Sequence, residues 1–135
     1  MAIVVLLGTL DTKGAEYAFL RDRVRSAGCD VVLVDAGVMS ESSPADISAD
    51  EVAAAAGENR AALAAAHDRG SAMAAMTRGA TAVVQRLRAE GRLDAVLGVG
   101  GSGGSSLVSA AMQALPIGVP KLLVSTMASG DTRPY

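Results

Sequence analysis

The residues best suited to chemistry lie in the stretch 98–106, which reads Gly-Val-Gly-Gly-Ser-Gly-Gly-Ser-Ser. An apolar run at residues 95–99 precedes this stretch, and a helical pattern at residues 107–115 follows it. A strand, a glycine turn and a helix in that order present backbone N–H groups at a helix N-terminus, and such groups bind phosphate and other anions. Because glycine has no Cβ, a ligand can approach its backbone closely. We therefore predict a phosphate-binding loop formed by Gly101, Ser102, Gly103, Gly104 and Ser105.

The pattern of apolar residues predicts the elements that must position this loop. Continuous aliphatic and β-branched runs are typical of strands buried on both faces, and they occur at residues 3–7, 30–35, 94–99 and 121–124. Further helical patterns lie at residues 13–27, 48–56, 58–67 and in a long segment that ends near Gly91. Ser48 and Glu51 form a capping box at the start of the second of these helices. Strands that alternate with helices predict an α/β fold, a doubly wound, Rossmann-like parallel sheet with helices on both faces.

The loops that follow the strands of a parallel sheet share one edge, and ligands bind in the crevice at that edge. These loops are residues 9–14, 35–37, 100–106 and 125–130. Three of the four are rich in glycine and small hydroxyl residues, a convergence that ordinary loop composition explains poorly. We predict a ligand site at this edge, where Ser125 and Thr126 donate hydroxyl hydrogen bonds to the ligand.

Length, charge and cysteine content exclude several classes of protein. The 135 residues suffice for one domain. Because the chain stops just after the fourth predicted strand, we expect residues 1–135 to be an incomplete domain of a larger protein. A formal net charge of −2 without a basic cluster argues against nucleic-acid binding, and no apolar run approaches the roughly 20 residues that cross a bilayer. The single cysteine, Cys29, cannot form an internal disulfide, which is typical of a cytoplasmic protein.

Known motifs overlap the glycine loop and give one alternative function. Residues 98–103 match Gly-x-Gly-x-x-Gly, but no carboxylate follows about 20 residues later, which argues against NAD. The chain has no Gly-Lys-Ser/Thr triplet of the Walker loop. Residues 100–104 match the Gly-x-Ser-x-Gly nucleophile turn, so the alternative is a serine hydrolase that uses Ser102. The one histidine, His67, precedes Ser102 in an alanine-rich helical stretch, where we expect a surface or packing role.

Few charged side chains are expected at the predicted edge. Asp11, Asp35 and Asp131 follow the first, second and fourth strands, where carboxylates could hold a Mg²⁺ ion that accompanies a phosphate. Alternatively, Asp11 caps the helix after it and Asp35 caps its own turn. Lys13 could offset phosphate charge or could be solvated, and Arg69 is expected at the surface, from where it could swing into the crevice. No base, nucleophile and orienting group can be assembled from the chain, so the sequence does not support hydrolysis of a bound phosphate compound.

Four motifs of this chain resemble those of a known family. They are residues 8–14 (GTLDTKG), 98–104 (GVGGSGG), 115–121 (LPIGVPK) and 125–132 (STMASGDT). Over essentially its whole length the chain is similar to the tomato mosaic virus resistance protein-like ATP-binding family. Members of this family have two α/β domains, and the N-terminal one binds ATP. The resemblance implies an N-terminal nucleotide-binding domain, with the second family domain absent from this chain.

The resemblance also implies which residues contact ATP. They lie in the loops after the first, third and fourth strands and are Asp11, Thr12, Gly101, Ser102, Gly103, Gly104, Ser125, Thr126, Met127 and Ala128. ATP, with or without Mg²⁺, is therefore the expected ligand. A third interpretation is an oligomerisation domain without a ligand, in which the glycines only allow close packing. The alanine-rich helices could offer flat apolar faces for a homodimer.

Overall fold

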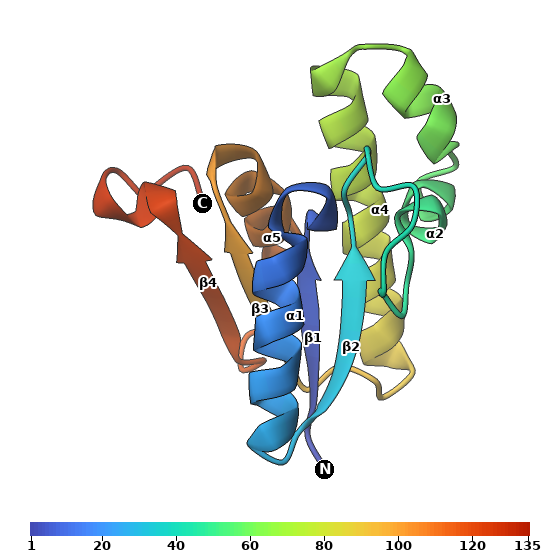
Figure 1. The fold of residues 1–135 in the computed structure, drawn as a ribbon. Helices are drawn as coiled ribbons and strands as arrows, with labels where there is room; N and C mark the ends of the chain where they lie inside the picture. The colour runs from blue at the N-terminus through green and yellow to red at the C-terminus, as the bar shows by residue number, and fades with distance from the viewer.

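The computed structural model describes residues 1–135 and has a four-stranded parallel sheet at its centre. The strands are β1 (Ile3–Gly8), β2 (Asp30–Asp35), β3 (Ala95–Gly100) and β4 (Lys121–Ser125), in the spatial order β2-β1-β3-β4. All four arrows in Figure 1 point toward the same edge of the sheet. The predicted α/β parallel fold is confirmed. Since the strand order reverses direction at β1, the switch point of the sheet lies between β1 and β3.

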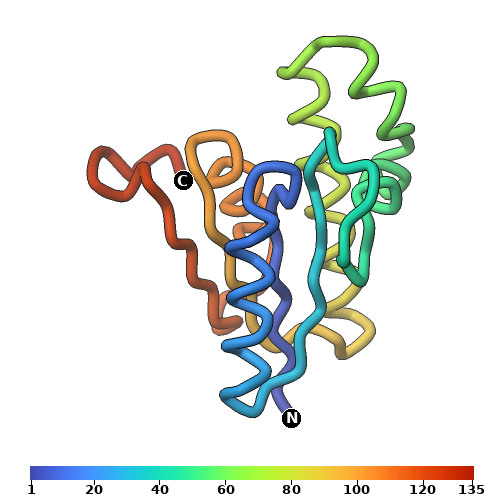
Figure 2. The backbone as a smooth tube through the Cα atoms, viewed as in Figure 1, coloured from blue at the N-terminus to red at the C-terminus, as the bar shows by residue number.

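Helices cover both faces of the sheet, as the sequence predicts. They are α1 (Leu10–Ser26), α2 (Ala49–Ala55), α3 (Arg60–Ala65), α4 (Arg69–Ala89) and α5 (Ser102–Gln113), with a 3-10 turn η1 (Thr126–Ser129) after β4. Helix α1 lies in front of the sheet in Figures 1 and 2, whereas α4 and α5 lie behind it. Because successive residues of a strand point to opposite faces, Leu6 packs with α1 while Val5 and Leu7 pack on the other side.

The hydrophobic core is aliphatic and rich in alanine. Its larger part, a cluster of 22 buried residues, lies between the sheet and the helices α2, α4 and α5. A smaller cluster of Leu6, Leu10, Tyr17 and Leu33 lies under α1. At Gly79 a Cβ would collide with the backbone carbonyl of Val52, so this glycine lets α4 approach α2 closely. No helix combines the length and the apolar character that crossing a membrane requires.

The helix starts differ from the prediction at two places. Helix α5 begins at Ser102 and not near residue 107, so residues 102–105 of the glycine stretch form its first turn. Helix α1 begins at Leu10, and Lys13 adopts a non-helical conformation (φ −126°, ψ 25°) that kinks the helix after its first turn. Turn residues of low helix propensity are tolerated in a first turn, because its N–H groups make no helical hydrogen bonds. At α2 the predicted cap is present, since the Ser48 hydroxyl accepts from the Glu51 N–H at 3.2 Å.

Candidate functional site

The strands β1 and β3 separate as they approach their carboxyl ends. They pair only at Val4–Ala95, Val5–Val96 and Leu6–Leu97. Beyond these pairs the buried hydroxyl of Tyr17 lies between the strands, donating to the Leu7 carbonyl at 2.6 Å and accepting from the Val99 N–H at 2.8 Å. The loops that follow β1 and β3 therefore diverge at the switch point of the sheet, where doubly wound folds bind ligands.

Tyr17 is tightly enclosed by its surroundings. A Cβ at position 8 would collide with the Tyr17 ring, so only Gly8 leaves room for it. Burial raises the pKa of Tyr17 to about 12, and the Val99 hydrogen bond opposes this shift only in part. The side chain therefore stays neutral at physiological pH and remains hydrogen-bonded between β1 and β3.

The glycines of the stretch 98–106 fall into two groups. A Cβ at Gly98 would lie 2.5 Å from a methyl group of Val108, and one at Gly100 would lie 2.8 Å from the Ser105 nitrogen, so packing requires these two glycines. At the other three, Gly101, Gly103 and Gly104, the nearest atoms to a Cβ would be 3.9, 3.2 and 3.7 Å away, and the 3.2 Å neighbour is the flexible end of Met73. Neither these contacts nor a left-handed backbone requires glycine there. Their small size leaves room for a molecule from outside the chain.

The first turn of α5 has free hydrogen-bond donors. Its first backbone bond joins the Ser105 N–H to the Gly101 carbonyl at 2.9 Å, and no side chain caps the helix. The N–H groups of Ser102, Gly103 and Gly104 therefore have no partner in the protein. Together with the helix dipole, three neighbouring free N–H groups favour a bound anion.

Helix α1 also starts without a cap from its own N-cap residue, Thr9. Instead, the Leu10 N–H donates to Oδ1 of Asp35 at 3.1 Å, and the same oxygen accepts from the Gly37 N–H at 2.8 Å. Asp35 is fully buried, so this carboxylate stabilises the backbone of both loops from inside the fold. Asp11 accepts from the Met39 N–H at 3.1 Å and thereby ties α1 to the loop after β2.

These contacts bear on the metal hypothesis for Asp11, Asp35 and Asp131. Asp35 accepts from backbone N–H groups, so its alternative role as a cap is present. Asp131 forms an ion pair with Arg133 at 2.6 Å, and this contact holds the pKa of Asp131 below its usual range. The structure does not bring the three carboxylates together as a metal site, since no group of three or more His, Cys, Asp or Glu side chains could hold a metal ion.

A cavity of about 580 Å³ opens at the switch point. Of the predicted ligand contacts, the structure brings five together in its wall, namely Asp11, Thr12, Gly101, Gly103 and Gly104. Lys13 and Arg69 also line the cavity, and neither forms an ion pair with a carboxylate. The cavity thus combines free N–H donors with two unpaired cations and the carboxylates of Asp11 and Asp68.

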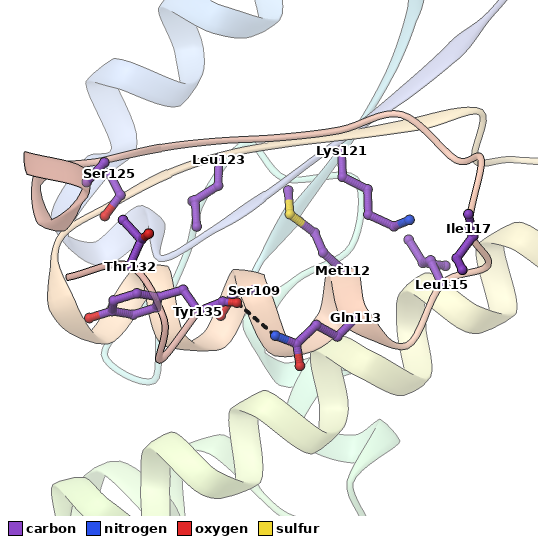
Figure 3. Close-up of a pocket in the computed structure, with 11 residues that line it drawn as sticks. Ser109, Met112, Gln113, Leu115, Ile117, Lys121, Leu123, Ser125, Thr132 and Tyr135 are labelled. Carbon is purple, nitrogen blue, oxygen red and sulfur yellow. Dashed lines mark hydrogen bonds between the residues drawn. The ribbon is translucent and has the colours of Figure 1, made fainter. Parts of the chain in front are cut away.

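The remaining predicted contacts lie apart from this cavity. Ser125 and Ala128 line a second cavity of about 520 Å³ between α5, β4 and the C-terminal segment, where Figure 3 shows Gln113 bonded to Tyr135. Ser105 is buried, and its hydroxyl is hydrogen-bonded to the hydroxyl of Ser125, which ties α5 to β4. Ser102, Thr126 and Met127 are exposed and line neither of these two cavities.

Sequence reasoning did not assign several further residues of the first cavity to the site, among them His67, Asp68 and Met73. His67 and Asp68, at the junction of α3 and α4, line its mouth, and Met73 of α4 approaches Gly103. His67 is the one non-glycine residue with a left-handed backbone (φ 53°). A helix that leads into a parallel strand starts at the carboxyl edge of the sheet, so the start of α4 could have been placed there from topology alone. The same topological argument places Arg69, at the first turn of α4, at the carboxyl edge of the sheet.

The geometry around Ser102 lacks the partners of a hydrolase. Its hydroxyl makes no hydrogen bond to His67 or to a carboxylate, and its φ is not in the left-handed region. A nucleophile turn holds its serine in a strained turn with a histidine within reach. No observation in the structure therefore favours the hydrolase alternative.

Comparisons with known proteins agree with the resemblance found in the sequence. The sequence model described as "Uncharacterised protein family (UPF0261) N-terminal domain" matches residues 2–135. A UPF0261 protein of Clostridium tetani is 44% identical over 133 residues, which cover 98% of this chain and 33% of that protein. Another, from Rhizobium meliloti, is 44% identical over 135 residues, 100% of this chain and 33% of that protein. The ToMV susceptible protein tm-1(GCR26) of Solanum lycopersicum is 35% identical over 148 residues, 98% of this chain and 20% of that protein.

The chain spans about a third of the length of these bacterial relatives and about a fifth of the tomato protein. Both kinds of relative match the strand, loop and helix segments that form the cavity, because the matched region covers nearly the whole chain. With the family model also matching from residue 2 to residue 135, the chain belongs to the UPF0261 family and corresponds to its N-terminal domain.

Proposed function

We propose that this domain binds a nucleotide, ATP, through the glycine- and serine-rich loop at the start of α5. The observation that carries the proposal is the set of three adjacent N–H groups, at Ser102, Gly103 and Gly104, that have no partner in the protein. Phosphate oxygens are suitable acceptors for such groups, and the dipole of α5 favours their negative charge. The resemblance to an ATP-binding family supports the choice of nucleotide.

The surroundings of the loop support the same ligand. The cavity volume of about 580 Å³ lies within the range of small-molecule sites, roughly 300 to 1,000 Å³. Lys13 and Arg69 form no ion pair, and their charges balance the two carboxylates, Asp11 and Asp68, that line the same cavity. Binding at the switch point is also the general rule for doubly wound sheets.

Magnesium fits this proposal as a companion of the phosphates. Asp11 lines the cavity, and only its Oδ2 atom is used by the Met39 N–H. Mg²⁺ is commonly held by one or two carboxylates together with substrate phosphates and water. Asp11 is thus the residue that would hold the ion, and no assembled protein cage is needed.

Calorimetric titration of ATP, with and without Mg²⁺, into the longest soluble form of the protein tests the proposal. We expect saturable binding that Gly103→Val lowers at least a hundredfold, because the new side chain fills the place of the phosphate. The fold should tolerate this change, since the nearest neighbour is the flexible end of Met73. The matched control is Gly70→Val, because Gly70 is the second residue of α4 as Gly103 is the second residue of α5.

Two outcomes would contradict the proposal. One is native ATP affinity in a folded Gly103→Val variant, which would place the phosphates elsewhere. The other is the absence of ATP binding to the folded native protein. The predicted homodimer is independent of both results and is measured by sedimentation velocity of the native protein.

A further inference from the structure

The second cavity, of about 520 Å³, shares no lining residue with the cavity at the switch point. Helix α5, strand β4 and the C-terminal segment each form part of its wall (Figure 3). More than half of its lining residues are hydrophobic, namely Met112, Leu115, Ile117, Leu123, Ala128 and Tyr135. Its volume lies within the range of small-molecule sites, roughly 300 to 1,000 Å³. The proposed nucleotide site gives this cavity no role.

A single charged side chain, Lys121 at the start of β4, lines the second cavity. Its ammonium group donates to the Pro116 carbonyl at 2.9 Å and forms no ion pair. An ammonium group has three N–H donors, so two remain for a ligand. No carboxylate lines this cavity, whereas Asp11 and Asp68 line the one at the switch point. The charge of the second cavity therefore favours an anion.

The charged and apolar groups of the second cavity follow one another along β4. Figure 3 shows Lys121 at one end, Ser125 and Thr132 at the other, and Leu123 and Met112 between them. A strand rises about 3.3 Å per residue, so Lys121 and Ser125 are about 13 Å apart along β4. The cavity is thus elongated, with a cation at one end, an apolar middle and hydroxyl groups at the far end.

The floor and the walls of this cavity are held in place by the protein itself. Met112 and Leu115, each 6% exposed, belong to the larger core cluster, and Leu123 packs against it. Gln113 of α5 donates to the Tyr135 carbonyl at 2.9 Å, which fixes the C-terminal segment over the cavity. The cavity is therefore preorganised before a ligand arrives, which lowers the cost of binding.

We propose that the second cavity binds a carboxylic acid with an apolar chain of medium length, such as a medium-chain fatty acid. The carboxylate accepts from the two remaining N–H groups of Lys121, and the chain covers Met112 and Leu123. The hydroxyl groups of Ser125 and Thr132 limit the length of the chain, because covering polar groups with an apolar chain is unfavourable. Affinity then comes from a charge-assisted hydrogen bond together with apolar burial.

Calorimetric titration of octanoate, below the concentration at which it forms micelles, into the longest soluble form of the protein tests the proposal. Acetate is one comparison compound, because it has the carboxylate without the chain. The other is 1-octanol, which has the chain without the charge. We expect saturable binding of octanoate that is at least tenfold tighter than the binding of either comparison compound.

Two variants test the role of the cation. Lys121→Gln should lower octanoate affinity at least tenfold and leave the affinity for 1-octanol unchanged. Because Lys121 is exposed, the variant should fold, which circular dichroism checks. Arg25→Gln is the matched control, since Arg25, near the end of α1, is also exposed, forms no ion pair and lines neither cavity. Its octanoate affinity should stay within twofold of native.

Four outcomes would overturn the acid site. The first is the absence of octanoate binding to the folded native protein. The second is equal affinity for octanoate and acetate, because the apolar middle would then contribute nothing. The third is equal affinity for octanoate and 1-octanol, and the fourth is native octanoate affinity in Lys121→Gln, since Lys121 would have no role in either case. All four leave the nucleotide proposal in place, because Lys121 does not line the switch-point cavity.

Discussion

The helices of this domain start in two different ways. Helices α2, α3 and α4 each have a side-chain cap, in which Ser48, Asn59 and Asp68 accept from an N–H group of the first turn. Helices α1 and α5 have none, and these two follow β1 and β3 at the switch point. A cap stabilises a helix by satisfying its free donors, so its absence leaves those donors available. The difference teaches that a helix start either has its N–H groups satisfied by a cap or keeps them available for an anion, and that both uncapped starts of this chain lie at the switch point.

The two uncapped starts are themselves unequal. At α1 the carboxylate of Asp35, from a neighbouring strand, accepts from the Leu10 N–H. At α5 no side chain serves in this way. The start of α5 is therefore the place where an added cap should change both stability and binding.

Adding a cap at α5 should have the largest effect. In Gly101→Asp the new carboxylate can accept from the N–H groups of Gly103 and Gly104, which stabilises the fold by about 0.5 kcal/mol. The same carboxylate repels a phosphate, so we expect ATP affinity to fall at least a hundredfold. Chemical denaturation measures the first effect, and calorimetric titration measures the second.

Gly130→Asp is the control for the added charge. A Cβ at Gly130 would have its nearest neighbour 3.9 Å away, the same clearance as at Gly101, but Gly130 does not line the cavity. We expect its ATP affinity to stay close to native. Tight ATP binding by Gly101→Asp would contradict the proposed role of the uncapped start of α5 in binding.

Tyr17→Phe should have the next largest effect, and it should change stability more than ATP affinity. The variant leaves the Leu7 carbonyl and the Val99 N–H without their shared partner between β1 and β3. Unpaired buried groups cost about 1 to 3 kcal/mol, so we expect a loss of about 2 kcal/mol at pH 7, measured by urea unfolding. Binding of ATP should weaken as well, because the loops after both strands depend on this spacing.

The pH dependence identifies the hydroxyl as the cause. Burial raises the pKa of Tyr17 from 10.0 to about 12, so the folded protein keeps the proton that the unfolded chain loses above about pH 10. The stability that Tyr17 contributes is therefore intact below pH 10 and is lost progressively as the pH rises toward 12, by about 2 to 3 kcal/mol. The difference in unfolding free energy between native protein and Tyr17→Phe should narrow over this range. A constant difference would show that the hydroxyl titrates normally.

Removing a cap away from the cavity should have the smallest effect and none on the ligand. In Ser48→Ala the Glu51 N–H loses its acceptor, which costs about 1 kcal/mol of unfolding free energy. We expect ATP affinity to stay within twofold of native in the folded variant. A large loss of affinity would mean that α2 helps to shape the cavity and that capped helices also act in binding.

Much of this arrangement could be predicted from the sequence, because it depends on local patterns. The four strands are continuous apolar runs, and all four were placed within one residue at either end. The glycine loop was found from its composition, but the start of α5 was placed too late. A run of glycines and serines has the composition of a turn. Here the hydrogen bond from the Ser105 N–H to the Gly101 carbonyl makes these residues the first turn of a helix.

The side chains that complete the cavity depend on distant packing and were harder to find. Met39 comes from a surface segment without apolar periodicity, and His67 lies at the end of a helical pattern that gives no indication of its distance from the cavity. Ser105 and Ser125 suggested ligand contacts by residue type, yet they bond to each other. A hydroxyl in sequence gives no indication of whether its partner is a ligand or another side chain.

The position of the Tyr17 hydroxyl between β1 and β3 has a consequence for how the domain opens. The Val99 amide is hydrogen-bonded to a side chain of α1 and not to a neighbouring strand. Its exchange with solvent deuterium therefore requires α1 to move away from the sheet, even while the remaining β1–β3 pairs persist. Helix α1 and the ends of β1 and β3 should thus open as one cooperative unit, so a single amide signal would report on the integrity of the ligand edge.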